Sequence, residues 1–121
     1  MTRIGLLRAA AILGALAVGL GAFGAHGLKG RVSAEDLTIF ETAVRYHAWH
    51  ALALLGCACL PADLKRVGAA AWLLLAGTVI FSGTLYLLVL LDQRWLGAVT
   101  PIGGTLLIAG WITLATARPR S

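Results

Sequence analysis

The chain has 121 residues, of which 60% are hydrophobic and 12% are charged, and its formal net charge at pH 7 is +5. Soluble domains have about half apolar and about a quarter charged residues, so this composition excludes an ordinary soluble domain and places the chain in a lipid bilayer. The ten basic residues are spread over the termini and loops. This distribution favours contact with lipid headgroups and argues against nucleic acid as a partner. We predict one domain over residues 1–121.

The first predicted element is a membrane span over residues 9–28. Arg3 and Arg8 precede an uncharged run from Ala9 to Leu28, which as a helix is roughly 30 Å long and matches the hydrocarbon core of a bilayer. A cleaved signal peptide is the alternative, because the start is basic, the middle is apolar and small residues lie near Ala15 to Ala25. The run is longer than the usual signal-peptide core of about 7–15 residues, so a retained span is favoured.

Small residues fall on two faces of this first span. At 100° per residue, one face holds Gly14, Ala17, Gly21, Gly24 and Ala25, and the other holds Ala15, Gly19, Ala22 and His26. Small residues allow neighbouring membrane helices to approach closely, so we expect the rest of the chain to pack around this span, chiefly around residues 19–28. The same glycines match a dinucleotide-binding pattern, but no strand precedes them, which argues against that interpretation.

The second predicted helix begins before the membrane. Ser33 followed by Asp36 is typical of a helix N-terminus, and Leu37, Phe40 and Val44 recur at helical spacing. This pattern predicts an amphipathic start at the membrane interface that continues into a span over residues 43–60. Pro61 then ends the helix.

The third and fourth spans are predicted over residues 67–91 and 96–117. Pro101 interrupts the fourth, which predicts either a kink or a helix that begins there with Thr100 as its cap. The predicted fold is therefore all-α: a four-helix transmembrane bundle with an interfacial amphipathic start to the second helix. The glycines that we expect at its helix contacts are Gly14, Gly19, Gly21, Gly24, Gly27, Gly83, Gly103 and Gly104.

Four crossings place both termini and the Pro61 turn on one side of the membrane. That side holds six of the ten basic residues, namely Arg3, Arg8, Lys65, Arg66, Arg118 and Arg120. Because basic residues are enriched on the cytoplasmic side of membrane proteins, we predict a protein of the cell inner membrane with both termini in the cytoplasm.

Polar side chains are expected to lie at a common depth near the opposite surface. Polar groups are unfavourable in hydrocarbon unless they bond to one another, so they should point inward. The predicted cluster consists of His26, His47, His50, Ser82, Tyr86 and Thr100. A hydrogen-bonded structural network is the first interpretation. A haem or metal site and a small-molecule, proton or quinone site are the alternatives.

Catalysis is not predicted, because the acidic residues all lie in interfacial segments and none can complete a nucleophilic triad within the spans. No carboxylate or thiolate lies at the depth of the histidines to complete a divalent-metal site. The sequence therefore predicts no enzyme and no resident cofactor.

Four motifs occur in a fixed order along the chain: Gly-Ala-Phe-Gly-Ala-His-Gly-Leu at 21–28, Glu-Thr-Ala-Val-Arg-Tyr-His-Ala-Trp-His-Ala-Leu at 41–52, Phe-Ser-Gly-Thr-Leu-Tyr at 81–86, and Thr-Pro-Ile-Gly-Gly at 100–104 followed by Gly-Trp at 110–111. In these motifs the chain resembles the family called domain of unknown function 423, which includes the eukaryotic transmembrane protein 256. The resemblance implies a small inner-membrane protein of about four helices, and it implies no activity.

Two classes of function are compatible with these residues. The first is a non-enzymatic structural, accessory or assembly component that contacts the lipid bilayer, other membrane proteins or a second copy of itself. The second is a membrane protein that binds a ligand or redox cofactor through His26, His50 and Tyr86. A minimal transporter or channel is a third interpretation, which the scarcity of charges in the spans disfavours.

Overall fold

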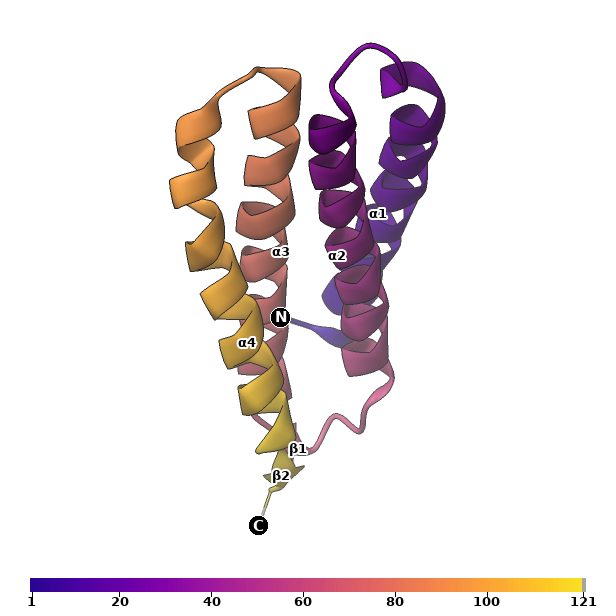
Figure 1. Cartoon of the computed structure of the whole chain (residues 1–121). Coiled ribbons are helices and arrows are strands. Elements are labelled where there is room, and N and C mark those ends of the chain that lie inside the picture. The colour runs from indigo at the N-terminus through magenta and orange to yellow at the C-terminus, as the bar shows by residue number, and fades with distance from the viewer. Residues whose placement is uncertain (121) are drawn as a thin grey trace.

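The computed structural model describes residues 1–120 and is helical almost throughout (Figure 1). The long helices are α1 (Arg3–Ala22), α2 (Ala34–Cys59), α3 (Val67–Leu90) and α4 (Thr100–Ala115). A π-helical segment, Phe23–Leu28, extends α1, and a 3-10 helix, Arg94–Ala98, precedes α4. Two short strands, β1 (Leu64–Lys65) and β2 (Arg118–Pro119), pair antiparallel and join the C-terminal tail to the α2–α3 loop. This strand pair is not predicted from the sequence.

The helix ends follow local chemistry. The Thr2 hydroxyl accepts a hydrogen bond from the Gly5 amide at 2.9 Å, and the Ser33 hydroxyl accepts one from the Asp36 amide at 3.1 Å. Both are N-cap bonds that satisfy amides left without a helical partner. The predicted start of the second helix at Ser33 is therefore confirmed. Pro101 lies in the first turn of α4, so the helix begins there without a kink, although its N-cap is Val99 rather than Thr100.

The helices form two hairpins whose inner members, α2 and α3, pack against each other (Figure 1). Helix α1 packs on α2, and α4 packs on α3. The expectation that the chain packs around residues 19–28 is therefore wrong. Only three residues of α1 are buried, whereas nine residues of α3 are. The apolar composition of α1 reflects exposure to lipid, because membrane helices need apolar residues on their outer faces as well.

Three helical segments are long and apolar enough to cross a membrane: Arg3–Leu28, Val67–Leu90 and Arg94–Ala115. Helix α2 is not among them, and its first half carries four charged residues: Glu35, Asp36, Glu41 and Arg45. It nevertheless has 26 residues, which corresponds to about 39 Å, and it lies alongside the other three (Figure 1). The crossing of the membrane by residues 43–60 thus stays a prediction.

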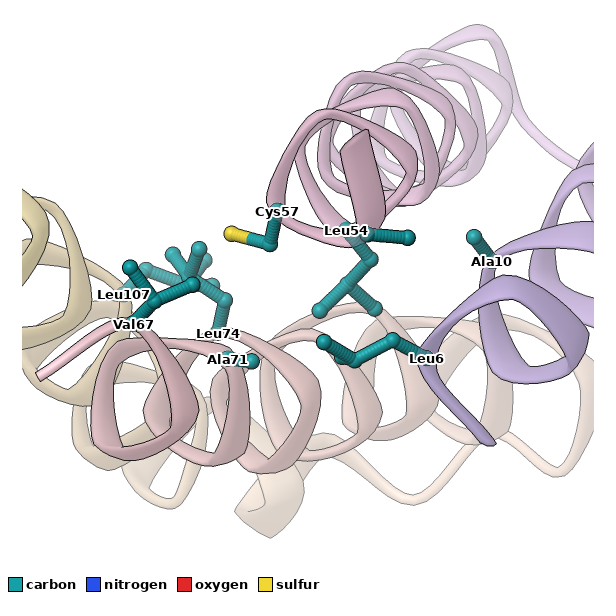
Figure 2. Packing of buried hydrophobic residues seen from close by; sticks show 9 residues of the cluster. Leu6, Ala10, Leu54, Cys57, Val67, Ala71, Leu74 and Leu107 are labelled. Carbon is teal, nitrogen blue, oxygen red and sulfur yellow. The ribbon is translucent and has the colours of Figure 1, made fainter. Parts of the chain in front are cut away.

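Two apolar clusters occupy the two ends of the bundle. The larger lies near the termini, where Leu54 and Cys57 of α2 face Ala71 and Leu74 of α3, with Leu6 of α1 beside them (Figure 2). The smaller lies near the α1–α2 and α3–α4 loops, and its buried members are Leu28, Phe40, Leu88 and Val89. His47, Ser82 and Tyr86 lie at the α2–α3 interface between these clusters, whereas Thr100 lies at the start of α4. The depth of these polar groups in the membrane stays a prediction.

Candidate functional site

A histidine–tyrosine pair lies at the interface of the two hairpins. His47 of α2 and Tyr86 of α3 are joined by a hydrogen bond of 2.8 Å between Nδ1 and the phenol oxygen. The imidazole is almost fully buried, with 4% of its surface exposed. Its other nitrogen, Nε2, makes no well-formed hydrogen bond within residues 1–120, although the imidazole lies near the Leu13 backbone of α1. Unpartnered buried polar atoms are rare in folded proteins, so this nitrogen marks a place where a water molecule or a ligand group would be stabilised.

His50 lies one turn further along α2 and has two partners of its own. Its Nδ1 is 2.6 Å from the Tyr46 carbonyl oxygen, and its Nε2 accepts a 3.1 Å hydrogen bond from the Trp111 indole. A carbonyl can only accept, so Nδ1 carries the proton and the imidazole is held in a single tautomer. This ring connects α2 to α4. Both nitrogens are engaged, so a ligand could reach one only by displacing a protein group.

The hydroxyl groups of the predicted cluster bond to backbone and to each other. Ser82 of α3 donates to the Ala43 carbonyl of α2 at 2.7 Å. Thr84 of α3 and Thr100 of α4 are 2.7 Å apart through their hydroxyl oxygens, and Thr100 also donates to the Leu96 carbonyl. These bonds connect neighbouring helices, as polar side chains do in membrane bundles.

His26 does not belong to this cluster. It lies in the π-helical segment, where its side chain is exposed. Gly24 and Leu28 are the buried residues of that segment, and Gly24 faces Phe40 of α2. His26 is two residues from each, so it points to the opposite side, away from the bundle. The prediction of a site containing both His26 and His50 is wrong for this reason.

The predicted packing glycines divide into two groups. A Cβ atom added at Gly21, Gly24, Gly103 or Gly104 would meet a side chain or backbone of the neighbouring helix within 4 Å, and one added at Gly27 would meet Phe23 of its own segment. Additions at Gly14, Gly19 and Gly83 would meet nothing within 4 Å. These three glycines therefore do not mediate close helix contacts in the described chain.

Two further glycines, which are not among those predicted, also lie at a close contact: Gly77 and Gly110 between α3 and α4. The seven-residue spacing of Gly103 and Gly110 was the available signal, because residues seven apart lie on one face of a helix.

Aromatic side chains surround the histidines. Tyr46, Trp49, His50, Phe81 and Trp111 line a groove of about 370 Å³ on the α2–α4 side of the bundle. The Tyr46 ring centroid is 4.6 Å from that of Phe81 and 5.1 Å from that of Trp49. The Trp111 ring lies against His50, with the two ring centroids 5.9 Å apart. The described residues contain no group of three histidine, cysteine or acidic side chains placed to hold a metal ion.

Known proteins resemble this chain over most of its length. The family described as "Protein of unknown function (DUF423)" matches residues 20–104. The UPF0382 membrane protein YwdK of Bacillus subtilis is 48% identical over 113 residues, covering 88% of this chain and 92% of its own. A UPF0382 membrane protein of Staphylococcus aureus is 50% identical over 111 residues, covering 88% of this chain and 91% of its own. No solved structure matches the chain significantly. The chain therefore belongs to the DUF423 family and is a membrane protein of a group whose molecular function is unknown.

Proposed function

We propose that this protein is a non-enzymatic accessory or assembly component of the cell inner membrane, acting through lateral contact of α1 with another membrane protein or a second copy of itself. The observation that supports the proposal is a difference between the two faces of α1 that hold small residues: small residues of the first face pack against α2, and those of the second do not. Gly24 and Ala17 on the first face are buried, and Gly21 lies against Val44 of α2. The second face remains open.

The open face consists of Ala15, Gly19, Ala22 and His26, all of which are exposed. A Cβ atom added at Gly19 would have no neighbour within 4 Å. Ile12, which lies seven residues before Gly19 on the same side of the helix, is also exposed. A row of small residues lets another membrane helix approach until backbones are in contact, and such packing is a main source of helix association in lipid.

Photo-crosslinking in the native membrane tests this proposal. A photoreactive amino acid at Ile12 should give a reproducible protein adduct, whereas the same residue at Val79, which is similarly exposed on α3, should give mainly lipid adducts. The substitution Gly19→Leu should remove the Ile12 adduct without lowering the unfolding temperature, because it fills open space. Lipid adducts alone at both positions would contradict the proposal.

Charge placement supports the proposed orientation with both termini in the cytoplasm. Arg3 donates to the Leu60 carbonyl, and the Arg120 amide donates to the Asp63 carbonyl, so both termini lie beside the α2–α3 loop. This end of the molecule carries six of the ten basic side chains. Because Cys59 is exposed, both native cysteines are first replaced by serine. Labelling of Ala62→Cys in intact cells, compared with Gly30→Cys in the same background, then measures the orientation, and labelling of Ala62→Cys from outside would contradict cytoplasmic termini.

The second candidate function is a small-molecule site at His47, favoured by the unpartnered Nε2. Protein purified without added cofactor would then release a bound molecule detectable by mass spectrometry, and a haem would show a visible absorption band. His47→Leu should abolish the release. His26→Gln should retain it, because His26 is exposed and lies outside the interface. A featureless visible spectrum together with an empty extract would exclude this candidate.

A further inference from the structure

The charges of the molecule are segregated between its two ends. The end that holds the α1–α2 and α3–α4 loops has four basic and four acidic side chains, namely Lys29, Arg31, Arg45 and Arg94 with Glu35, Asp36, Glu41 and Asp92. The end that holds the termini has six basic side chains, and Asp63 is its one acidic side chain within residues 1–120. The whole formal net charge of +5 therefore lies at the terminal end.

A pocket of about 310 Å³ opens at this basic end, near the lower limit of the roughly 300–1,000 Å³ that small-molecule sites occupy. Arg3 of α1 and Arg120 of the C-terminal tail both line it. Its remaining walls come from the ends of α1, α2 and α3 and from the α2–α3 loop, and they include Leu6, Leu60 and Val67. Two arginines thus line a cavity whose other lining residues are of apolar types.

The backbone fixes both arginines at the pocket. Arg3 donates through one guanidinium nitrogen to the Leu60 carbonyl at 2.7 Å. Arg120 follows β2, which pairs with β1, and its amide donates to the Asp63 carbonyl at 3.1 Å. Within residues 1–120 neither side chain forms an ion pair. Their remaining N–H groups are therefore available to an anion, and guanidinium groups match the geometry of phosphate oxygens.

We propose that this pocket binds the phosphate group of an anionic phospholipid, with Arg3 and Arg120 as its ligands. The position of the pocket favours a lipid over a soluble phosphate. Arg3 lies in the first turn of α1, and Leu7, one turn deeper on the same face, is exposed. A headgroup at Arg3 thus places its acyl chains along the apolar outer surface of α1, at the depth where the hydrocarbon of the bilayer begins.

Two double variants distinguish lipid binding in the pocket from general electrostatic attraction of lipid to the basic end. In detergent-purified protein, retained phosphatidylglycerol is measured by native mass spectrometry, with phosphatidylcholine as the uncharged probe. Arg3→Gln with Arg120→Gln should lower phosphatidylglycerol binding on the order of tenfold. The double variant Lys65→Gln with Arg118→Gln removes the same amount of charge at the same end but outside the pocket. It should lower phosphatidylglycerol binding less than twofold. Equal losses in the two double variants would overturn the proposal.

A third variant tests the cavity without changing any charge. Gly68 of α3 lines the pocket, and a Cβ atom added there would meet nothing within 4 Å. Gly68→Leu should therefore fill the cavity, keep the unfolding temperature and reduce bound phosphatidylglycerol as strongly as the arginine variants. Unchanged lipid binding in this variant would show that the pocket is not the site. Equal competition by soluble glycerol 3-phosphate would overturn the lipid assignment in favour of a soluble phosphate.

Discussion

The two hairpins are held together in different ways. In the α3–α4 hairpin, three glycines come close to the backbone of the neighbouring helix: Gly77, Gly103 and Gly110. A Cβ atom added at Gly103 would lie 2.8 Å from the Phe81 Cα, and one added at Gly77 would lie 2.9 Å from the Leu107 nitrogen. In the α1–α2 hairpin the closely packed glycines face side chains, with Val44 Cγ1 3.3 Å from the added atom at Gly21. A side chain can rotate away and a helix backbone cannot. The α3–α4 hairpin is therefore the more constrained half of the molecule.

The interface between the hairpins is of a third kind. It contains the His47–Tyr86 pair, the bond from Ser82 to the Ala43 carbonyl and the Tyr46–Phe81 ring contact. An outer hydrogen bond, Arg94 to Asp36, joins the same two halves at 2.7 Å near the loops. Glycine contacts thus build the α3–α4 unit, and polar and aromatic side chains fix its position against the α1–α2 unit. This division supports a structural role for most of the polar side chains.

The largest effect is expected from Gly103→Ala in the constrained hairpin. The added methyl group meets the Phe81 backbone, so α3 and α4 must separate, at a free energy of about 3 kcal/mol, the upper part of the usual range for overpacking. Unfolding in detergent, followed by tryptophan fluorescence, measures this loss.

Gly83→Ala is the matched control for that variant, because the added methyl group at Gly83 has no neighbour within 4 Å. Its unfolding free energy should equal or slightly exceed that of the wild type, because alanine favours a helix over glycine. If Gly103→Ala and Gly83→Ala had the same unfolding free energy, the close backbone contact at Gly103 would not constrain the α3–α4 hairpin.

The second effect, in the interface between hairpins, is expected from Tyr86→Phe. It removes the partner of His47 Nδ1 and leaves both nitrogens of a buried imidazole without a hydrogen bond. The expected loss of unfolding free energy is about 1.5 kcal/mol. Tyr46→Phe is the control, since no hydrogen bond joins the Tyr46 hydroxyl to another residue within 1–120. A loss as large in the control would assign the effect to ring packing.

The helices could be predicted from the sequence because their signals are local. Runs of apolar residues, the Ser33 cap and the Pro61 stop each act within a few residues, and the observed bounds of α2 follow them. The order of packing could not be predicted in this way. In a membrane, a lipid-facing surface and a helix-facing surface are both apolar, so the glycine content of α1 predicts a central position although the helix lies at the edge.

The candidate site could be predicted in part. Polar side chains within a membrane bundle are expected to form hydrogen bonds with one another. His47 does so with Tyr86, and His50 with Trp111. The rotation of each helix about its axis decides which side chains meet, and the sequence carries little information on it. The prediction for His26 is wrong for this reason, because this side chain in the π-helical segment is exposed and lies outside the interface between the hairpins.

The third effect, in the α1–α2 hairpin, is expected from Gly24→Ala. The added methyl group would lie 2.9 Å from a ring carbon of Phe40, which is fully buried but can shift as a side chain. We expect a loss of about 1 kcal/mol, clearly smaller than at Gly103. Combining it with Phe40→Leu should recover part of the loss relative to the sum of the single variants. Strict additivity would indicate that the two residues do not compete for space.

The smallest effect is expected where the two halves meet in water. The hydrogen bond from Arg94 holds the pKa of the Asp36 carboxyl below its ordinary value of 3.8. A lowered pKa in the folded state stabilises the fold above pH 3.8, and this contribution disappears as the pH falls through the folded-state pKa. Asp36→Asn should therefore lower the unfolding temperature by a few degrees at about pH 7, and at about pH 3 the difference from wild type should shrink. Glu35→Gln removes the neighbouring acid, which forms no ion pair within residues 1–120. The unfolding temperature of this variant should match that of the wild type at every pH. If the lower unfolding temperature of Asp36→Asn persisted in acid, the charge of the Asp36 carboxylate would not be what joins the hairpins there.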